Sequence, residues 1–382
     1  MNAALETDDL VRLVRRIFLP GPDDRGLALL VDLPDDQLPD HERWRARRAM
    51  AADWQRALEQ GRAELGIDPV SLVLYRNARR NNADLPSEAT IHAGGDLPET
   101  ADAAAAAGTA PFAELFERYS MLVAVTELSA TAPLKLQAPR YGFRAATMPG
   151  FTAGMIPALK LDYEEIHARC VELKEKLDAA TAAHCRFRAG GIEDELTLDL
   201  RHRTATASGG LVRQPGTAGN LPSGETYIVP YEGEREGDAS RTRGVLPLEL
   251  DGELLRYRIE ENRVVEVLGE GEAAARERAE MKREPAYRNV AELGLGLLGG
   301  YGIQPVGEIL LDEKLGLHIA FGRSDHFGGQ VGAKDFTSPD RVVHIDRVYI
   351  PEMQPLVEPL AVDLEVGPGG DRVPLMRDGR YV

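Results

Sequence analysis

The stretch GLALLVDL, residues 26–33, is a continuous apolar run that Pro34 closes. An uninterrupted apolar run of this length is typical of a strand buried on both faces of a parallel sheet. Helical spacing precedes it in residues 8–18 and follows it in residues 41–65, and a second apolar run lies at residues 70–75. Helices and strands in this order predict an α/β arrangement.

The same alternation continues along the chain. An alanine tract at residues 103–107 leads through a predicted helix to a third apolar run at residues 121–126, and residues 142–147 and a turn at residues 148–150 follow. Strands and helices joined by short connections favour a parallel sheet. The sequence therefore predicts an α/β N-terminal domain with a parallel sheet over residues 1–165.

Near residue 165 the sequence changes from alternating helix and strand patterns to a different pattern. Residues 163–183 are predicted as one helix, because Ile166, Cys170 and Leu173 lie along one stripe. Short, β-rich runs follow, separated by glycine, asparagine and proline, at residues 196–200, 226–229, 245–250 and 254–267. This pattern predicts an α+β C-terminal domain over residues 166–382, with a mixed or antiparallel sheet.

Charge and composition limit the partners of the chain. Its 382 residues carry a formal net charge of −17, which argues against nucleic acid or an anionic membrane surface as a partner. Only two cysteines occur, no signal peptide is visible, and no apolar run has the length of a membrane span. We therefore expect a soluble, cytoplasmic protein that binds neither nucleic acid nor membranes.

Acidic and histidine residues occur beside glycines in three stretches of the second half. The first, residues 219–225, ends in Glu225, and the second, residues 291–296, contains Glu292. Glycine at these places lets the backbone approach other groups closely. The third stretch holds the remaining candidates, which are Glu313, His318, Asp325, His326, His344 and Asp346.

The setting of the histidines indicates metal binding. His344 and Asp346 are two residues apart in a strand-like run, so both side chains leave the same face. His318 lies in a second strand-like run at residues 317–321. Carboxylate oxygens and imidazole nitrogens without a thiolate suit Zn²⁺, Co²⁺, Mn²⁺ or Fe²⁺. The residues predict a metal site in the C-terminal domain.

Each of these residues also has a structural interpretation. A glutamate that follows a turn, such as Glu225, is usually solvated, and a His-x-Asp pair on a strand is commonly a surface pair. The Asp-Glu-Lys sequence around Glu313 is by default an exposed charged turn. The glycines at residues 294 and 296 lack the strand–loop–helix frame and the Lys-Ser/Thr pair of a phosphate loop, so we reject that function.

Taken in order and with their spacings, these stretches resemble the aminopeptidase T/aminopeptidase S family of metallopeptidases (M29-like). The similarity begins at residues 145–150, strengthens over residues 194–197 and 220–225, and is clearest over residues 292–346. The resemblance implies ligands for two divalent metal ions, Zn, Co or Mn, formed by Glu225, Glu292, His318, His344 and Asp346.

The resemblance also implies a mechanism. Glu313 would be the general base that takes a proton from the attacking water, in a metal-dependent aminopeptidase that acts on a peptide or small amide. Family members form homodimers, so a homodimer is implied here. Two departures concern Asp325, which stands in place of a family tyrosine, and Ile345, which stands in place of a tryptophan. Asp325 and the following His326 are therefore additional candidate ligands, and an altered substrate is an alternative.

A mononuclear Fe(II) enzyme is a further alternative. Dihydroxypyridine ring-cleaving dioxygenases resemble the same scaffold but hold one Fe²⁺ with two histidines and a carboxylate. In those enzymes a histidine occupies the place of Glu292, and the place of Glu225 lacks a carboxylate. Both glutamates remain in this chain, which favours the dinuclear hydrolase. Asp325 and His326 could supply different metal ligands, so the oxygenase remains an alternative. A binding protein with a degenerate site is a third interpretation.

Overall fold

A computed structural model describes residues 4–382, which group into two units. The N-terminal unit comprises the residues up to His167 together with Ser208–Ser223 and Val306–Leu311. The C-terminal unit comprises Ala168–Ala207, Gly224–Pro305 and Asp312–Val382. The first change of unit falls close to the predicted boundary at residue 165, and two later segments return to the N-terminal unit.

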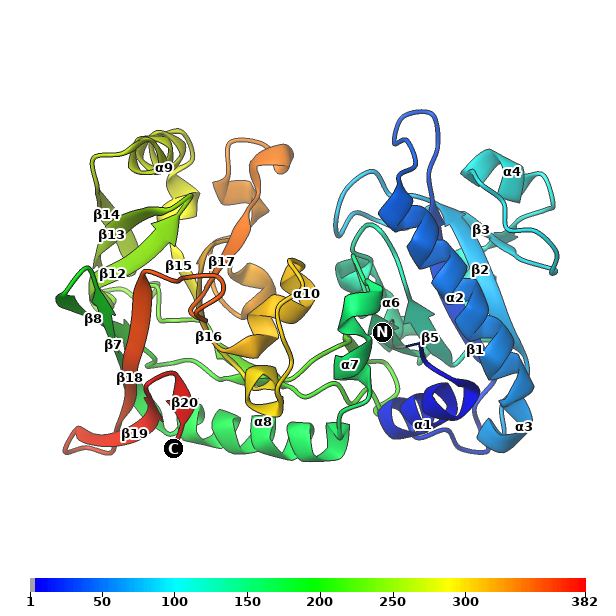
Figure 1. The fold of residues 1–382 in the computed structure, drawn as a ribbon, viewed down its shortest axis with the longest axis horizontal. Coiled ribbons are helices and arrows are strands. Elements are labelled where there is room, and N and C mark those ends of the chain that lie inside the picture. The colour runs from blue at the N-terminus through cyan, green and yellow to red at the C-terminus, as the bar shows by residue number, and fades with distance from the viewer. Residues whose placement is uncertain (1–3) are drawn as a thin grey trace. The chain divides into compact units, whose positions relative to one another are not determined.

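The N-terminal unit contains a seven-stranded sheet with the order β10-β6-β5-β1-β2-β3-β4. Figure 1 labels β1, β2, β3 and β5 of this sheet. The strands from β10 to β2 run parallel, whereas β3 is antiparallel to β2, and β4 to β3. This confirms the predicted α/β architecture with a parallel sheet. The strands are β1 Leu27–Leu33, β2 Val70–Arg76, β3 Glu88–Ile91, β4 Ala110–Pro111, β5 Met121–Ala124, β6 Arg144–Thr147 and β10 Ala218–Asn220.

Strand β1 lies at the centre of this sheet. Every residue from Leu27 to Leu33 is buried, and Leu27 pairs with Val70 of β2 on one edge and Met121 of β5 on the other. A central strand of a parallel sheet is covered on both faces, so apolar residues are favoured at every position. The interpretation of residues 26–33 as a buried parallel strand is confirmed.

The helix predicted over residues 41–65 is divided in two at Gly61, where φ is −86° and ψ is 1°. A side chain there would lie 2.5 Å from Val11 Cγ2, so glycine allows the close approach to α1. Within residues 4–382, no helix combines the length and apolar character needed to cross a membrane. The helices of this part of the chain are α1 Thr7–Phe18, α2 Glu42–Gln60, α3 Arg62–Leu65, α4 Ala101–Ala105, α5 Phe112–Arg118, α6 Thr131–Tyr141, η1 Ala153–Met155, α7 Ile156–Leu159 and α8 Tyr163–Asp178.

The C-terminal unit contains an eight-stranded sheet, β14-β13-β12-β8-β7-β18-β19-β20, and a five-stranded sheet, β17-β16-β15-β11-β9. All neighbours in the larger sheet are antiparallel, as are the pairs from β17 to β11 in the smaller one. The strands are β7 Ala180–Ala189, β8 Ile192–Asp199, β9 Thr206–Ser208, β11 Glu225–Ile228, β12 Arg243–Leu250, β13 Glu253–Glu260, β14 Arg263–Leu268, β15 Val290–Gly296, β16 Leu317–Gly322, β17 His344–Val348, β18 Val357–Val366, β19 Asp371–Arg377 and β20 Arg380–Tyr381.

Short helical segments connect these strands. The longest of the segments between β7 and β20 is the 12-residue helix α9, which lies between β14 and the candidate site strand β15. The others are single turns in the loops that lead to and from the site strands. The segments are α9 Glu272–Arg283, η2 Pro285–Arg288, η3 Leu298–Tyr301, α10 Ile309–Asp312, η4 Glu313–Leu315, η5 Asp325–Phe327, η6 Ala333–Asp335 and η7 Pro339–Arg341.

The helix predicted over residues 163–183 is too long. Helix α8 ends at Asp178, and the chain enters β7 at Ala180. Ala183 pairs with Leu198 of β8 on one edge and Leu364 of β18 on the other. Alanine favours a helix locally, but strand pairing on both edges outweighs a preference of less than about 1 kcal/mol per residue.

Candidate metal centre

Five of the predicted site residues lie on neighbouring strands of the five-stranded sheet. Glu225 begins β11, Glu292 lies in β15, His318 in β16, and His344 and Asp346 in β17. Residues that pair directly across antiparallel strands share a face, and so do alternate residues of one strand. The register of these strands therefore places all five side chains on one face.

Small residues fill the intervening positions of this face. They include Gly294, which pairs with His318, and Ala320, which pairs with Asp346. A Cβ atom on Gly294 would lie only 1.8 Å from His318 Nε2, so the imidazole occupies space that any other residue would fill. The glycines noted in the sequence thus make room for the candidate ligands.

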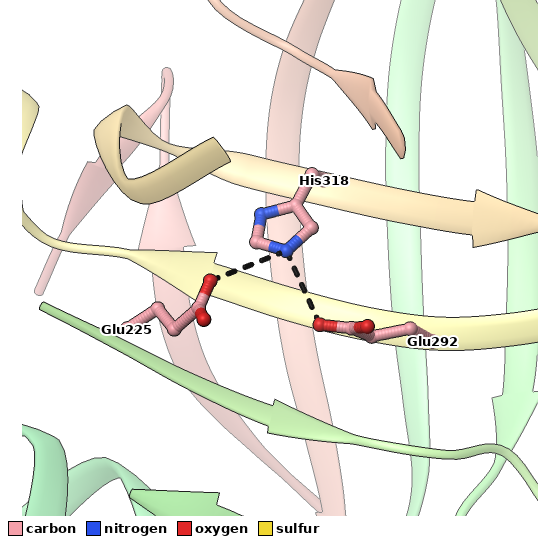
Figure 2. A group of neighbouring side chains, drawn as sticks. All are labelled: Glu225, Glu292 and His318. Atoms are coloured by element: carbon pink, nitrogen blue, oxygen red, sulfur yellow. Dashed lines mark hydrogen bonds and ion pairs between the residues drawn. The ribbon is translucent and has the colours of Figure 1, made fainter. Parts of the chain in front are cut away.

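Glu292 connects two groups of donor atoms. Its Oε1 lies 3.3 Å from His318 Nε2, and its Oε2 lies 3.1 Å from His344 Nε2. Glu225 Oε2 lies 3.6 Å from His318 Nε2 (Figure 2) and completes the first set, the His318 group. Asp346 Oδ1 lies 3.5 Å from His344 Nε2 and completes the second, the His344 group. The donor atoms of each group lie within 4.8 Å of one another, a spacing that suits a common cation.

The backbone orients both histidines. His318 Nδ1 lies 3.2 Å from the carbonyl oxygen of Gly316, and His344 Nδ1 lies 2.7 Å from that of Arg323. A carbonyl oxygen only accepts, so each Nδ1 donates its hydrogen. In the neutral form of each ring, the Nε2 atom then faces the carboxylates with a lone pair available for a cation, as in metal-binding histidines whose other nitrogen is held by a carbonyl.

The burial of the carboxylates bears on whether these groups could hold a cation. Glu225 and Glu292 are 6% and 3% exposed. Glu225 Oε2 is buried and accepts no hydrogen bond from any residue that the structure describes. A buried carboxylate oxygen that accepts no hydrogen bond is costly, and a divalent cation in the His318 group would satisfy it. The donor set and its geometry therefore fit a metal ion.

The site groups shift one another's protonation. Burial would raise the pKa of Glu292, but hydrogen bonds from His318 and His344 hold it well below its usual value. Burial would lower the pKa of His318, yet its hydrogen bond with Glu292 raises it to about 9. Protons and divalent cations compete for the same imidazole nitrogens, so these carboxylates would equally favour a bound cation.

Glu313 and Lys314 lie next to the His318 group, in η4. Lys314 is 1% exposed; its Nζ donates to Glu225 Oε1 at 2.7 Å and to the Glu313 carboxylate. Burial, opposed by Lys314, raises the pKa of Glu313 to about 8. The interpretation of this segment as an exposed charged turn is wrong, because Lys314 and Asp312 are both buried. Sequence reasoning missed Lys314, whose only signal was its place after Glu313.

The two additional candidates lie beside the His344 group. Asp325 Oδ1 accepts from Arg323 Nε at 2.5 Å. The His326 ring lies 3.9 Å from that of Phe327 and 5.3 Å from that of His344, measured between centroids. Neither residue joins a group of metal-binding geometry within the described part of the chain.

Comparisons with known proteins show the fold but no family. No protein-family model and no curated protein matches the chain. The structure of 2,5-dihydroxypyridine dioxygenase from Pseudomonas putida KT2440 matches with 16% identity and a TM-score of 0.63, over 100% of this chain and 98% of that one. Wild-type AmpT from Thermus thermophilus matches with 18% identity and a TM-score of 0.55, over 98% and 99%. The chain shares its fold with both.

Proposed function

We propose that this chain is a metal-dependent, aminopeptidase-like hydrolase in which the His318 group and the His344 group each hold one divalent cation. The observation that carries the proposal is the position of Glu292, whose two carboxylate oxygens face one histidine each. A carboxylate shared in this way suits a pair of neighbouring cations. Glu225 Oε2, which is buried and accepts no hydrogen bond from the described residues, supports the position in the His318 group.

The chemistry would divide between the cations and Glu313. A pair of divalent cations polarises a substrate carbonyl and makes water more acidic. Glu313 lies at the edge of the His318 group, where its carboxylate accepts a hydrogen bond from Lys314. A carboxylate at this position would accept a proton from the attacking water and donate it to the leaving amine. Lys314 holds the Glu313 carboxylate in place for both transfers.

The second candidate is a mononuclear Fe(II) oxygenase, and the similarity to a dihydroxypyridine dioxygenase favours it. The group that contains His344 and Asp346 has Glu292 as its third member, so it would supply one of the two histidines and the carboxylate of such a site. One cation would, however, leave two further buried carboxylates, Glu225 and Glu292, with less compensation of their charge. The two glutamates therefore favour the hydrolase.

The test compares two reactions of the same protein after loading with Zn²⁺, Co²⁺, Mn²⁺ or Fe²⁺. We expect release of free amine from peptides with a free N-terminus, and its loss in Glu292→Gln. Glu280→Gln is the matched control, because Glu280 is a solvent-facing carboxylate on α9. Fe²⁺-dependent oxygen uptake with 2,5-dihydroxypyridine, without amine release, would establish the oxygenase instead.

The proposal also covers the class of substrate and the oligomeric state. We propose a peptide or small amide as the substrate and a homodimer as the working form, because the sequence blocks resemble those of the aminopeptidase T family. Light scattering on the purified chain measures the assembly. A mass of one chain, about 42 kDa, at the concentration of the activity assay would contradict the homodimer.

A further inference from the structure

Lys314 places a buried ammonium group inside the candidate centre. Its side chain is 1% exposed, and its Nζ contacts the carboxylates of Glu225 and Glu313. The backbone around it has little freedom, because a Cβ atom on Gly296 would lie 2.3 Å from the carbonyl carbon of Lys314. The ammonium group is therefore held at this position by contacts on both its side chain and its backbone.

The ammonium group of Lys314 contacts a candidate ligand of the His318 group but not the ligands that distinguish the His344 group. In the His318 group, Glu225 gives Oε1 to Lys314 at 2.7 Å, and only Oε2 remains for a cation. In the His344 group, the ligands besides the shared Glu292 are His344 and Asp346, and the contacts of Lys314 Nζ are with other residues. A cation in the His318 group would thus face a fixed charge of the same sign across a single carboxylate.

We infer that Lys314 makes the two cation positions unequal, so that the His344 group fills first and the His318 group binds its cation more weakly. The inference rests on the proposed function, because it assumes that both groups bind a divalent cation. Repulsion between like charges is strong where water is excluded, and a residue that contacts a ligand commonly changes metal affinity about 10–100-fold. The enzyme would then be fully loaded only when the free cation concentration is high.

The test is a titration of cation-free protein with Zn²⁺ in competition with a chromophoric chelator. We expect two stepwise dissociation constants for the wild type, separated by about 10–100-fold. Lys314→Met should tighten the second step and leave the first nearly unchanged, so that the separation shrinks by about 10-fold or more. Lys176→Met is the matched control, because Lys176 forms an exposed helical ion pair with Glu172.

A second variant covers the case in which Lys314→Met does not fold, as judged by circular dichroism. Lys314→Arg retains the positive charge and should preserve two unequal steps. Equal constants in the wild type would overturn the inference, and so would an unchanged separation in folded Lys314→Met. Either result leaves the proposed function standing, whereas a wild type that binds no divalent cation would refute both.

Discussion

Replacing Gly294 by alanine tests whether His318 must occupy its present position to bind a cation. An alanine there would place its Cβ atom 1.8 Å from His318 Nε2, 2.2 Å from Cε1 and 2.4 Å from Cδ2. The imidazole would have to move by roughly 1.7 Å to restore the ~3.5 Å separation of unbonded heavy atoms. Strand β15 has little freedom to move instead, because β11 and β16 pair with it on both edges.

A movement of this size is large for a metal ligand, whose position must hold within roughly 0.5 Å. We therefore expect Gly294→Ala to weaken Zn²⁺ binding by about 10-fold or more. Crowding of a packed site should also lower the free energy of unfolding by about 1–3 kcal/mol. Competition titration with a chelator measures the first quantity, and urea unfolding of the cation-free protein measures the second.

Gly300→Ala is the matched control, because a Cβ atom on Gly300 would meet no atom within 4 Å. It should keep the wild-type Zn²⁺ affinity and differ little in stability. If Gly294→Ala bound Zn²⁺ as tightly as Gly300→Ala, His318 could not be a ligand in the position described, and the reasoning would be refuted.

Three further predictions concern the base, the cations and a buried acid. Glu313→Gln should lower kcat by about 10²–10⁴ without changing the metal content measured by mass spectrometry; full turnover would rule out Glu313 as the base. Removal of divalent cations by a chelator should lower the midpoint of thermal unfolding, because ligand binding stabilises the folded state, and Zn²⁺ should restore it; an unchanged midpoint would argue against a bound cation. Burial raises the pKa of Asp32 from its usual 3.8 to about 6. The folded state then binds this proton more tightly than the unfolded chain, so the stabilising contribution is complete below about pH 4 and is lost as the pH rises through 6, by up to about 3 kcal/mol. Urea unfolding of the wild type and of Asp32→Asn between pH 4 and 7 measures this change, and parallel pH profiles would contradict it.

Local patterns predicted much of the fold. The apolar run at residues 26–33 identifies a central parallel strand, because a strand covered on both faces has a direct sequence signature. The end of α8 has no such signature, since Ala180 to Ala183 favour a helix locally and become a strand only through pairing with β8 and β18. A local sequence pattern does not contain information about pairing between strands that are distant in the sequence.

In the candidate site, too, some features follow from the local sequence and others depend on long-range strand pairing. That His344 and Asp346 share a face follows from the alternation of side chains along one strand. The two-group arrangement around Glu292 depends on the register of four strands, which no single stretch encodes. The burial of Lys314 depends likewise on the strand that packs against η4. Sequence reasoning therefore reached the candidate ligands but missed the lysine among them.

If Glu292 is shared by two cations, each chain should bind two of them, and counting bound cations measures this. Equilibrium dialysis at saturating Zn²⁺, followed by mass spectrometry, would be applied to the wild type, Glu225→Gln and Glu292→Gln. We expect about two Zn²⁺ per chain in the wild type, the loss of one in Glu225→Gln and weakened binding of both in Glu292→Gln. A wild type that binds a single cation at saturation, or a Glu292→Gln variant that still holds two tightly, would contradict this expectation.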